Sequence, residues 1–155
     1  ARLFGCEVVY YSTTGRHDDP DYCRVDKETL FRESDIISIH APLTAATENL
    51  VGERELAWMK RDAVLLNLGR GPIVDQQALA QALKSGQIGG AGLDVLTAEP
   101  MAADNPLLEI QDSTRLIITP HIAWATVEAR QRCADEVYEN IRAFLAGEER
   151  NLCHG

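Results

Sequence analysis

Long apolar runs, paired cysteine motifs and basic clusters are all missing from this 155-residue sequence. It contains no run of about 18 uncharged apolar residues that could cross a bilayer, and its first residues, ARLFG, lack the layout of a secretion signal. We therefore expect a cytoplasmic protein with no membrane partner. The net charge of −9, with no basic cluster to offset it locally, argues against nucleic acid as a partner.

The four cysteines are widely scattered and show no C-x-x-C spacing: Cys6, Cys23, Cys133 and Cys153. Zinc sites and redox motifs bring their cysteines close together in the chain. We therefore expect reduced thiols and no metal site.

Short apolar runs alternate with amphipathic segments along the chain, a pattern that predicts a parallel α/β sheet with helices on both faces. Strands are predicted at residues 6–11, 35–39, 63–68, 88–95 and 115–119. Helices are predicted at residues 26–33, 53–59, 75–86 and 126–145, and residues 1–4 resemble the last turn of a helix. Asp26 and Asp75 are the expected N-terminal caps, whereas Gly5, Gly86 and Gly147 are the expected stops.

Three loop segments carry charged or titratable residues directly after predicted strands. They are residues 67–71, 94–100 and 120–124. Ligands of a doubly wound sheet bind at the carboxyl ends of its strands. We therefore expect these loops to meet on one rim of the sheet and to form a functional site.

Each of these residues has a functional and a structural interpretation. Arg70, between two glycines, could present its guanidinium to a carboxylate or be a surface arginine in a tight turn. His121 could be a general acid–base or a hydrogen-bonded histidine at a strand end. Glu99 could orient that imidazole or be a solvated turn residue, and Asp94 could bind a carboxamide or cap its loop. Their occurrence together favours the functional interpretation.

Four segments, in order and in spacing, resemble the D-isomer-specific 2-hydroxyacid dehydrogenase family. They are HAPLTAAT (residues 40–47), LLNLGRGPIVD (65–75), ALKSGQIGGAGLDVLTAEP (82–100) and ITPHIAWAT (118–126). The resemblance implies an oxidoreductase that transfers a hydride between NAD or NADP and a small D-2-hydroxy or 2-oxo acid, such as glycerate, hydroxypyruvate or glyoxylate. HIAWAT is similar to the glycerate dehydrogenase or hydroxypyruvate reductase branch, and the family suggests a homodimer for the complete protein.

The resemblance also implies roles for single residues. Arg70 would hold the substrate carboxylate, His121 would exchange a proton with the substrate oxygen, and Glu99 would pair with His121. Trp124 would lie beside the small substrate, although a tryptophan here could serve packing alone. The implied cofactor contacts are Ala41, Pro42, Thr47, Leu68, Gly69, Arg70 and Asp94.

The glycine-rich turn G-x-G-x-x-G, which cradles a pyrophosphate in dinucleotide-binding domains, is missing. We therefore expect the first strand, this turn and the substrate domain upstream of Ala1. The predicted fold is a truncated doubly wound parallel sheet of the Rossmann type: residues 1–125 as an incomplete dinucleotide-binding domain, and residues 126–155 as a helix and tail that return toward the substrate domain. The helix would expose part of its apolar face, and the polypeptide alone would bind dinucleotide poorly and turn over negligibly.

Ser12 stands where an acidic residue usually binds the ribose 2′-hydroxyl of the cofactor. Without that carboxylate a 2′-phosphate is not repelled, and Arg16 is near enough in sequence to attract one, which makes NADPH use credible. Alternatively, Arg16 is solvated and NAD is bound through hydroxyl contacts.

Two other functions belong to the same architecture. A non-enzymatic NAD-sensing scaffold, such as the C-terminal-binding-protein corepressors, retains similar catalytic residues and stays an alternative. Formate dehydrogenase pairs its histidine with a glutamine, so Glu99 argues against that activity.

Overall fold

The computed structural model describes residues 1–16 and 18–152, and it divides the chain into two compact units, Ala1–Pro120 and His121–Gly155. The predicted division between residues 125 and 126 falls inside the second unit, and Cys153 lies outside the described residues. The elements in chain order are η1 (Arg2–Phe4), β1 (Val9–Tyr10), β2 (Cys23–Arg24), α1 (Lys27–Glu33), β3 (Ile36–Ile39), α2 (Glu53–Trp58), β4 (Val64–Asn67), η2 (Gly71–Ile73), α3 (Gln76–Ser85), β5 (Gly90–Leu93), η3 (Pro106–Glu109), β6 (Leu116–Ile118) and α4 (Val127–Ala146), where η denotes a 3₁₀ helix.

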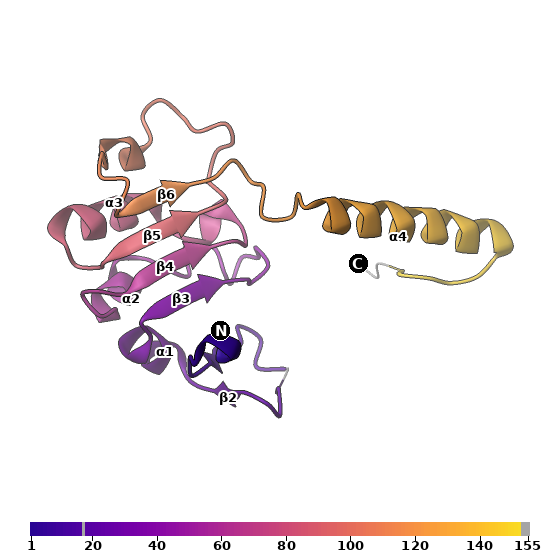
Figure 1. The fold of residues 1–155 in the computed structure, drawn as a ribbon, viewed down its shortest axis with the longest axis horizontal. Helices are drawn as coiled ribbons and strands as arrows, with labels where there is room; N and C mark the ends of the chain where they lie inside the picture. Colours follow the sequence, from indigo (N-terminus) through magenta and orange to yellow (C-terminus); the bar gives the residue numbers. More distant parts are fainter. Residues whose placement is uncertain (17, 153–155) are drawn as a thin grey trace. The chain divides into compact units, whose positions relative to one another are not determined.

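The first unit contains a four-stranded parallel sheet in the order β3-β4-β5-β6, so each strand pairs with the next one along the chain (Figure 1). Asn67, at the end of β4, is in register with Ile39 on one side and Leu93 on the other. The carboxyl ends of three neighbouring strands are therefore level. Strands β1 and β2 form a separate parallel pair.

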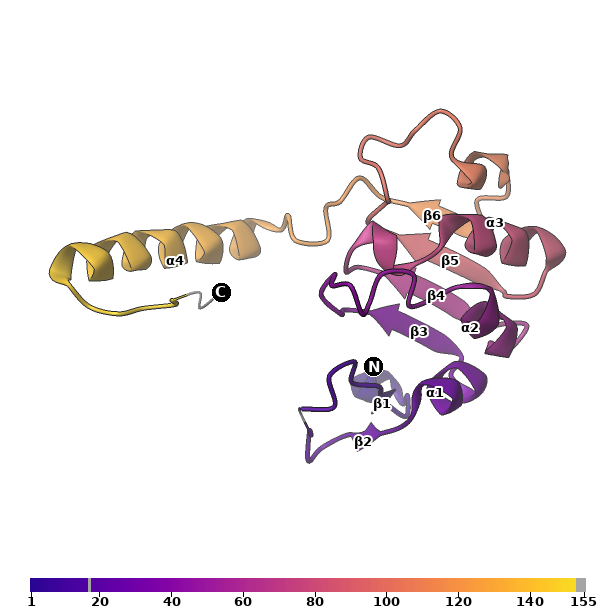
Figure 2. The same ribbon diagram turned by 180° about the vertical axis from the view of Figure 1, so that it is seen from behind.

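Helices α1, α2 and α3 pack against one another in sequence and cover a single face of this sheet (Figures 1 and 2). The expectation of helices on both faces is wrong for the described part of the first unit. Right-handed crossovers between strands that are added in one direction all place their helices on the same side. On the other face Ile36 and Ile117 are about three-fifths exposed, at 62% and 61%.

Local signals set the helix ends as expected. The Asp26 carboxylate accepts a hydrogen bond from the Thr29 backbone N–H at 2.9 Å, and Asp75 caps α3 in the same way. Gly86 ends α3 in the left-handed conformation, with φ 71°. Beneath these helices lies a core whose largest fully buried apolar side chains are Leu56, Leu65, Ile73, Leu79, Leu83, Ile88 and Leu107.

A buried carboxylate fastens α2 to α1. Glu55 is 5% exposed, and it pairs with Lys27 of α1 at 2.7 Å and with Arg54 at 2.8 Å. Its other oxygen accepts a hydrogen bond from the Gly52 backbone N–H. Burial of Glu55 opposes its ionisation, but the two cations and the N–H outweigh burial and lower its pKa to about 2.

The strands are shorter than the apolar runs that predicted them, and one strand was not predicted. Strand β1 keeps only Val9–Tyr10 of the run at residues 6–11. Strand β2, Cys23–Arg24, has two exposed residues and therefore lacks the apolar pattern that marks a buried strand.

The second unit consists mainly of α4, which begins after the Thr126 cap and ends at Gly147 in the left-handed conformation. Its predicted apolar face is partly exposed, because Tyr138 is 63% and Phe144 81% accessible to solvent. The tail returns along the helix, where Arg150 pairs with Glu136 at 2.7 Å. Among the described residues, no helix combines the length and the apolarity that a membrane span needs.

Candidate active site

The loop that follows β4 is organised by Asn67, whose side chain is buried. Its Nδ2 donates to the Arg70 carbonyl at 2.9 Å, and its Oδ1 accepts from the Gly69 N–H at 3.1 Å. Its backbone carbonyl also accepts from the Asp94 N–H at 3.0 Å. One residue therefore shapes the Gly-Arg-Gly turn and ties it to the loop after β5. Sequence reasoning missed this role, although an asparagine within the apolar run AVLLNL was a visible signal.

Two glycines let neighbouring loops touch through their backbones. A Cβ at Gly71 would lie 2.0 Å from the carbonyl carbon of Leu96, and a Cβ at Gly69 would lie 3.0 Å from the Ala41 carbonyl oxygen. Only glycine fits at the first position without a shift of backbone. The loops after β3, β4 and β5 are therefore packed directly together.

Asp94 joins a third strand end to this group. It is 4% exposed, and its Oδ1 accepts a hydrogen bond from the Thr119 hydroxyl at 2.6 Å. Thr119 directly follows β6 and also donates its backbone N–H to Leu93. Thr119 is a second residue whose role sequence reasoning missed, because a threonine at a strand end carries no distinctive signal.

A cleft of about 470 Å³ opens between the loops after β3 and β4. It is lined by His40, Ala41, Pro42, Leu43, Leu68, Gly69 and Arg70. Five of the residues that the resemblance assigned to cofactor binding therefore meet at one place. Thr47 is buried behind this wall, where its hydroxyl donates to the Pro42 carbonyl at 2.7 Å. Ser12, in the loop after β1, is not among the lining residues.

Arg70 and Glu99 are both exposed, and they lie on the two loops that Asn67 joins. The Arg70 side chain is anchored to its own loop, since its Nη1 donates a hydrogen bond to the Gly69 carbonyl at 2.8 Å. The Glu99 Oε1 accepts the Leu96 N–H at 2.9 Å, which folds residues 96–99 into a turn. A guanidinium and a carboxylate are thus presented at the carboxyl edge of the same sheet.

His121 and Trp124 belong to the second unit, where they lie side by side. The indole Nε1 of Trp124 donates to the His121 carbonyl at 2.8 Å. His121 has φ 55°, a left-handed conformation that costs a residue with a Cβ roughly 1 kcal/mol and that is frequent at functional sites. The convergence of His121 with Arg70 and Glu99 stays a prediction.

A parallel sheet with crossover helices and a cleft at the carboxyl ends of its strands defines the class of nucleotide-binding α/β domains. A sequence model of the D-isomer specific 2-hydroxyacid dehydrogenase NAD binding domain matches residues 1–123. The chain belongs to the D-isomer-specific 2-hydroxyacid dehydrogenase family, which confirms the resemblance carried by the four motifs.

Named relatives agree with this family. The glycerate dehydrogenase of Methylorubrum extorquens is 49% identical over 128 residues, which cover 83% of this chain and 40% of the relative. The glyoxylate reductase of Korarchaeum cryptofilum is 44% identical over 151 residues, which cover 96% of this chain and 45% of the relative. This chain therefore spans about half the length of the curated relatives it matches.

Solved structures confirm the predicted fold class. An acyclic imino acid reductase in complex with NADPH and D-Arg superposes with a TM-score of 0.89 at 37% identity, covering 99% of this chain and 48% of that one. The D-lactate dehydrogenase of Lactobacillus jensenii with NAD⁺ superposes with a TM-score of 0.87 at 30% identity, covering 99% and 50%.

The cleft fits a flat group that is partly apolar, as a nicotinamide is. Leu43 and Leu68, which line it, are 43% and 42% exposed. The absence of a side chain at Gly69 lets the backbone approach such a group closely. Within residues 1–16 and 18–152, no three His, Cys, Asp or Glu side chains gather as a metal site would require.

Proposed function

We propose that the full-length protein is an NAD(P)-dependent D-2-hydroxyacid dehydrogenase that acts on a short 2-oxo or 2-hydroxy acid, such as hydroxypyruvate, glyoxylate or glycerate. The observation that carries this proposal is the joined rim of β4, β5 and β6, where Asn67, Asp94 and Thr119 tie the strand ends together. This rim presents the Arg70 and Glu99 loops at one edge. The names of the relatives, glycerate dehydrogenase and glyoxylate reductase, support the same substrate class.

Bound NAD(P)H would supply the hydride. The side chains of this chain would bind the substrate carboxylate and deliver a proton to the substrate oxygen. The Arg70 guanidinium matches a carboxylate with two parallel N–H donors, so it fixes the orientation of a 2-oxo acid as well as its position. This orientation would set the carbonyl group beside the cleft that Leu68 and Gly69 line.

Reduction of a carbonyl group to a hydroxyl group requires a proton at oxygen, and we assign its delivery to the His121 imidazole. Glu99 would hold the orientation of this imidazole. Thr119 supports the assignment, because it lies two residues before His121 in the chain and is anchored to Asp94 on the rim. Trp124, whose indole N–H donates a hydrogen bond to the His121 carbonyl, would border the substrate side chain and favour small acids.

The test is the oxidation of NADH and NADPH by the full-length protein with a panel of short 2-oxo acids. Replacement His121→Ala should lower kcat by roughly two to four orders of magnitude. Replacement His40→Ala removes an imidazole from the cleft wall instead and should cost less than about tenfold, because we assign it no proton transfer.

A loss of less than about tenfold for His121→Ala would remove this residue from the acid–base role. Cofactor binding without turnover of any acid in the panel would instead favour the non-enzymatic NAD-sensing scaffold.

The proposal includes a homodimer, in keeping with the family resemblance, and a location in the cytoplasm. Light scattering of the purified full-length protein should give the mass of two chains. A single-chain mass would contradict this part of the proposal without affecting the assigned chemistry.

A further inference from the structure

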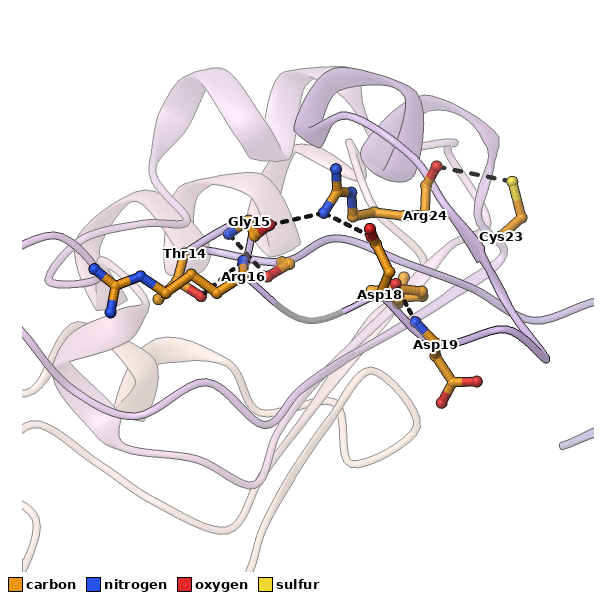
Figure 3. Close-up of polar contacts among 9 residues, drawn as sticks. Thr14, Gly15, Arg16, Asp18, Asp19, Cys23 and Arg24 are labelled. Carbon is orange, nitrogen blue, oxygen red and sulfur yellow. Dashed lines mark hydrogen bonds and ion pairs between the residues drawn. The ribbon is translucent and has the colours of Figure 1, made fainter.

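The loop after β1 forms a compact turn whose polar groups are arranged around Gly15. The Ser12 hydroxyl accepts the Gly15 N–H at 3.0 Å, and the Thr14 hydroxyl accepts the Arg16 N–H at 3.4 Å (Figure 3). Gly15 itself is left-handed, with φ 66°. The turn therefore carries hydroxyl groups and the exposed Arg16 directly beyond the strand.

A second arginine reaches this turn from the neighbouring strand. The Arg24 Nη1 donates to the Gly15 carbonyl at 3.0 Å and pairs with the Asp18 carboxylate at 2.8 Å. Gly15 thus links Ser12, through its N–H, to the Arg24 guanidinium, through its carbonyl. Figure 3 shows the Arg16 guanidinium extending away from the Arg24–Asp18 pair, so the two cations lie on opposite sides of the turn.

The segment that carries Asp18 is anchored to β1. The Asp19 backbone N–H donates to the Tyr10 hydroxyl at 2.9 Å, and the Asp21 N–H donates to the Asp19 carboxylate at 2.9 Å. These bonds fix the segment that carries Asp18 opposite Arg24. The ion pair is exposed, with 41% of the Arg24 side chain and 78% of the Asp18 side chain accessible.

We propose that Arg24 is a specificity-determining residue for the ribose 2′-phosphate of NADPH, and that Asp18 is the counter-ion that competes with this phosphate. The inference rests on the proposed function and extends it to the choice of cofactor. In dinucleotide-binding domains a residue just beyond the second strand faces the ribose 2′ position, and the family resemblance assigns this place to Ser12, in the loop after β1.

A competition between two anions follows from this arrangement. A phosphate carries more charge than a carboxylate and has three acceptor oxygens, so it can displace an exposed carboxylate from a guanidinium. The displaced Asp18 would still repel the phosphate from close range. Asp18 therefore lowers the preference for NADPH, whereas Arg24 raises it. A 2′-hydroxyl carries no charge, so NADH binding is nearly indifferent to both residues.

The experiment measures the affinities of the full-length protein for adenosine 2′,5′-bisphosphate and for adenosine 5′-monophosphate by calorimetry. These probes differ only in the 2′-phosphate, and their binding requires no catalysis. Asp18→Asn should raise the ratio of the two affinities about three- to tenfold, and Arg24→Gln should lower it by a similar factor, as expected for one exposed charge beside an anion.

Asp35→Asn is the matched control. Asp35 pairs with Lys60 at 2.7 Å, with 86% and 43% of the two side chains exposed, and it directly precedes β3, at the amino end of the sheet. This variant loses an equally exposed ion pair and should leave the ratio within about twofold.

The two variants of the pair also separate folding from recognition. Tighter binding of the bisphosphate by Asp18→Asn cannot arise from loss of structure, and Arg24→Lys, which keeps the charge, should retain part of the preference. Ratios unchanged in Asp18→Asn and Arg24→Gln would overturn the inference, and binding of neither probe would overturn it together with the proposed function. The two affinity ratios could also change as predicted in a protein that reduces no 2-oxo acid. This result would uphold the inference and defeat the proposed function.

Discussion

Replacement Glu55→Gln should destabilise the first unit by an amount that depends on pH. The pKa of Glu55 falls from its usual 4.5 to about 2. A difference of about 2.5 pK units corresponds to about 3 kcal/mol. Lys27 keeps 23% of its side chain exposed and can rehydrate when the carboxylate is lost. We therefore expect a loss of about 2–3 kcal/mol in the free energy of unfolding at pH 7.

The sign of the pH dependence follows from the lowered pKa. Because Glu55 is more acidic in the folded chain than in the unfolded chain, its contribution is complete above pH 4.5 and declines as the pH falls toward 2. The difference between wild type and variant should therefore be smaller by about 1.4 kcal/mol at pH 3.5 than at pH 7, and it should continue to fall at lower pH.

Urea unfolding followed by tryptophan fluorescence provides the assay. Trp58 ends α2, and the Arg54 guanidinium lies 5.2 Å from the centre of its ring, so its emission reports on this region. A Trp124→Phe background leaves Trp58 as the only tryptophan of the chain. Glu28→Gln, which breaks an exposed pair with Arg32, should cost no more than about 0.5 kcal/mol. An equal loss in both variants, or a Glu55→Gln loss that does not change with pH, would refute the reasoning.

Three further substitutions test the rim and the helix caps. Gly71→Ala should cost at least about 2–3 kcal/mol in thermal or urea unfolding, because the new methyl group meets the Leu96 backbone, and an unaffected stability would contradict the close approach of the two loops. Thr119→Val, which removes the donor to Asp94 with little change of shape, should weaken NADH binding about three- to tenfold in a calorimetric titration, whereas unchanged affinity would show that this bond does not support the site. Asp75→Ala should lower the free energy of unfolding by about 1 kcal/mol, and a neutral result would mean that the first turn of α3 needs no cap.

The helix ends were predictable because their causes are local in the chain. Asp26 and Asp75 bond to N–H groups within the next three residues, and Gly86 and Gly147 supply the left-handed conformation that ends a helix. The face on which the helices lie was not predictable from amphipathic patterns. It depends on the order in which the strands join the sheet, which is a property of the whole fold.

The candidate site was predictable to the level of its loops. Parallel strands bring their carboxyl ends together, so the meeting of the segments around Arg70 and Glu99 follows from strand order alone. The bonds that hold them there, from Asn67 and Thr119, connect positions about 25 residues apart and leave no periodic trace in the sequence. Arg24 escaped notice for a similar reason, since its strand is two residues long and exposed.

The hydrogen bonds of Asn67 limit how this protein can be engineered. Its side chain shapes the Gly69–Arg70 turn, and its carbonyl holds Asp94. A chimaera that took only the Gly69–Arg70 turn from a relative would contain the turn sequence of that relative. It would lack the adjoining segments that support this turn in the relative. Transplants of specificity into this scaffold should therefore exchange residues 67–71, 94–99 and 119 as one block.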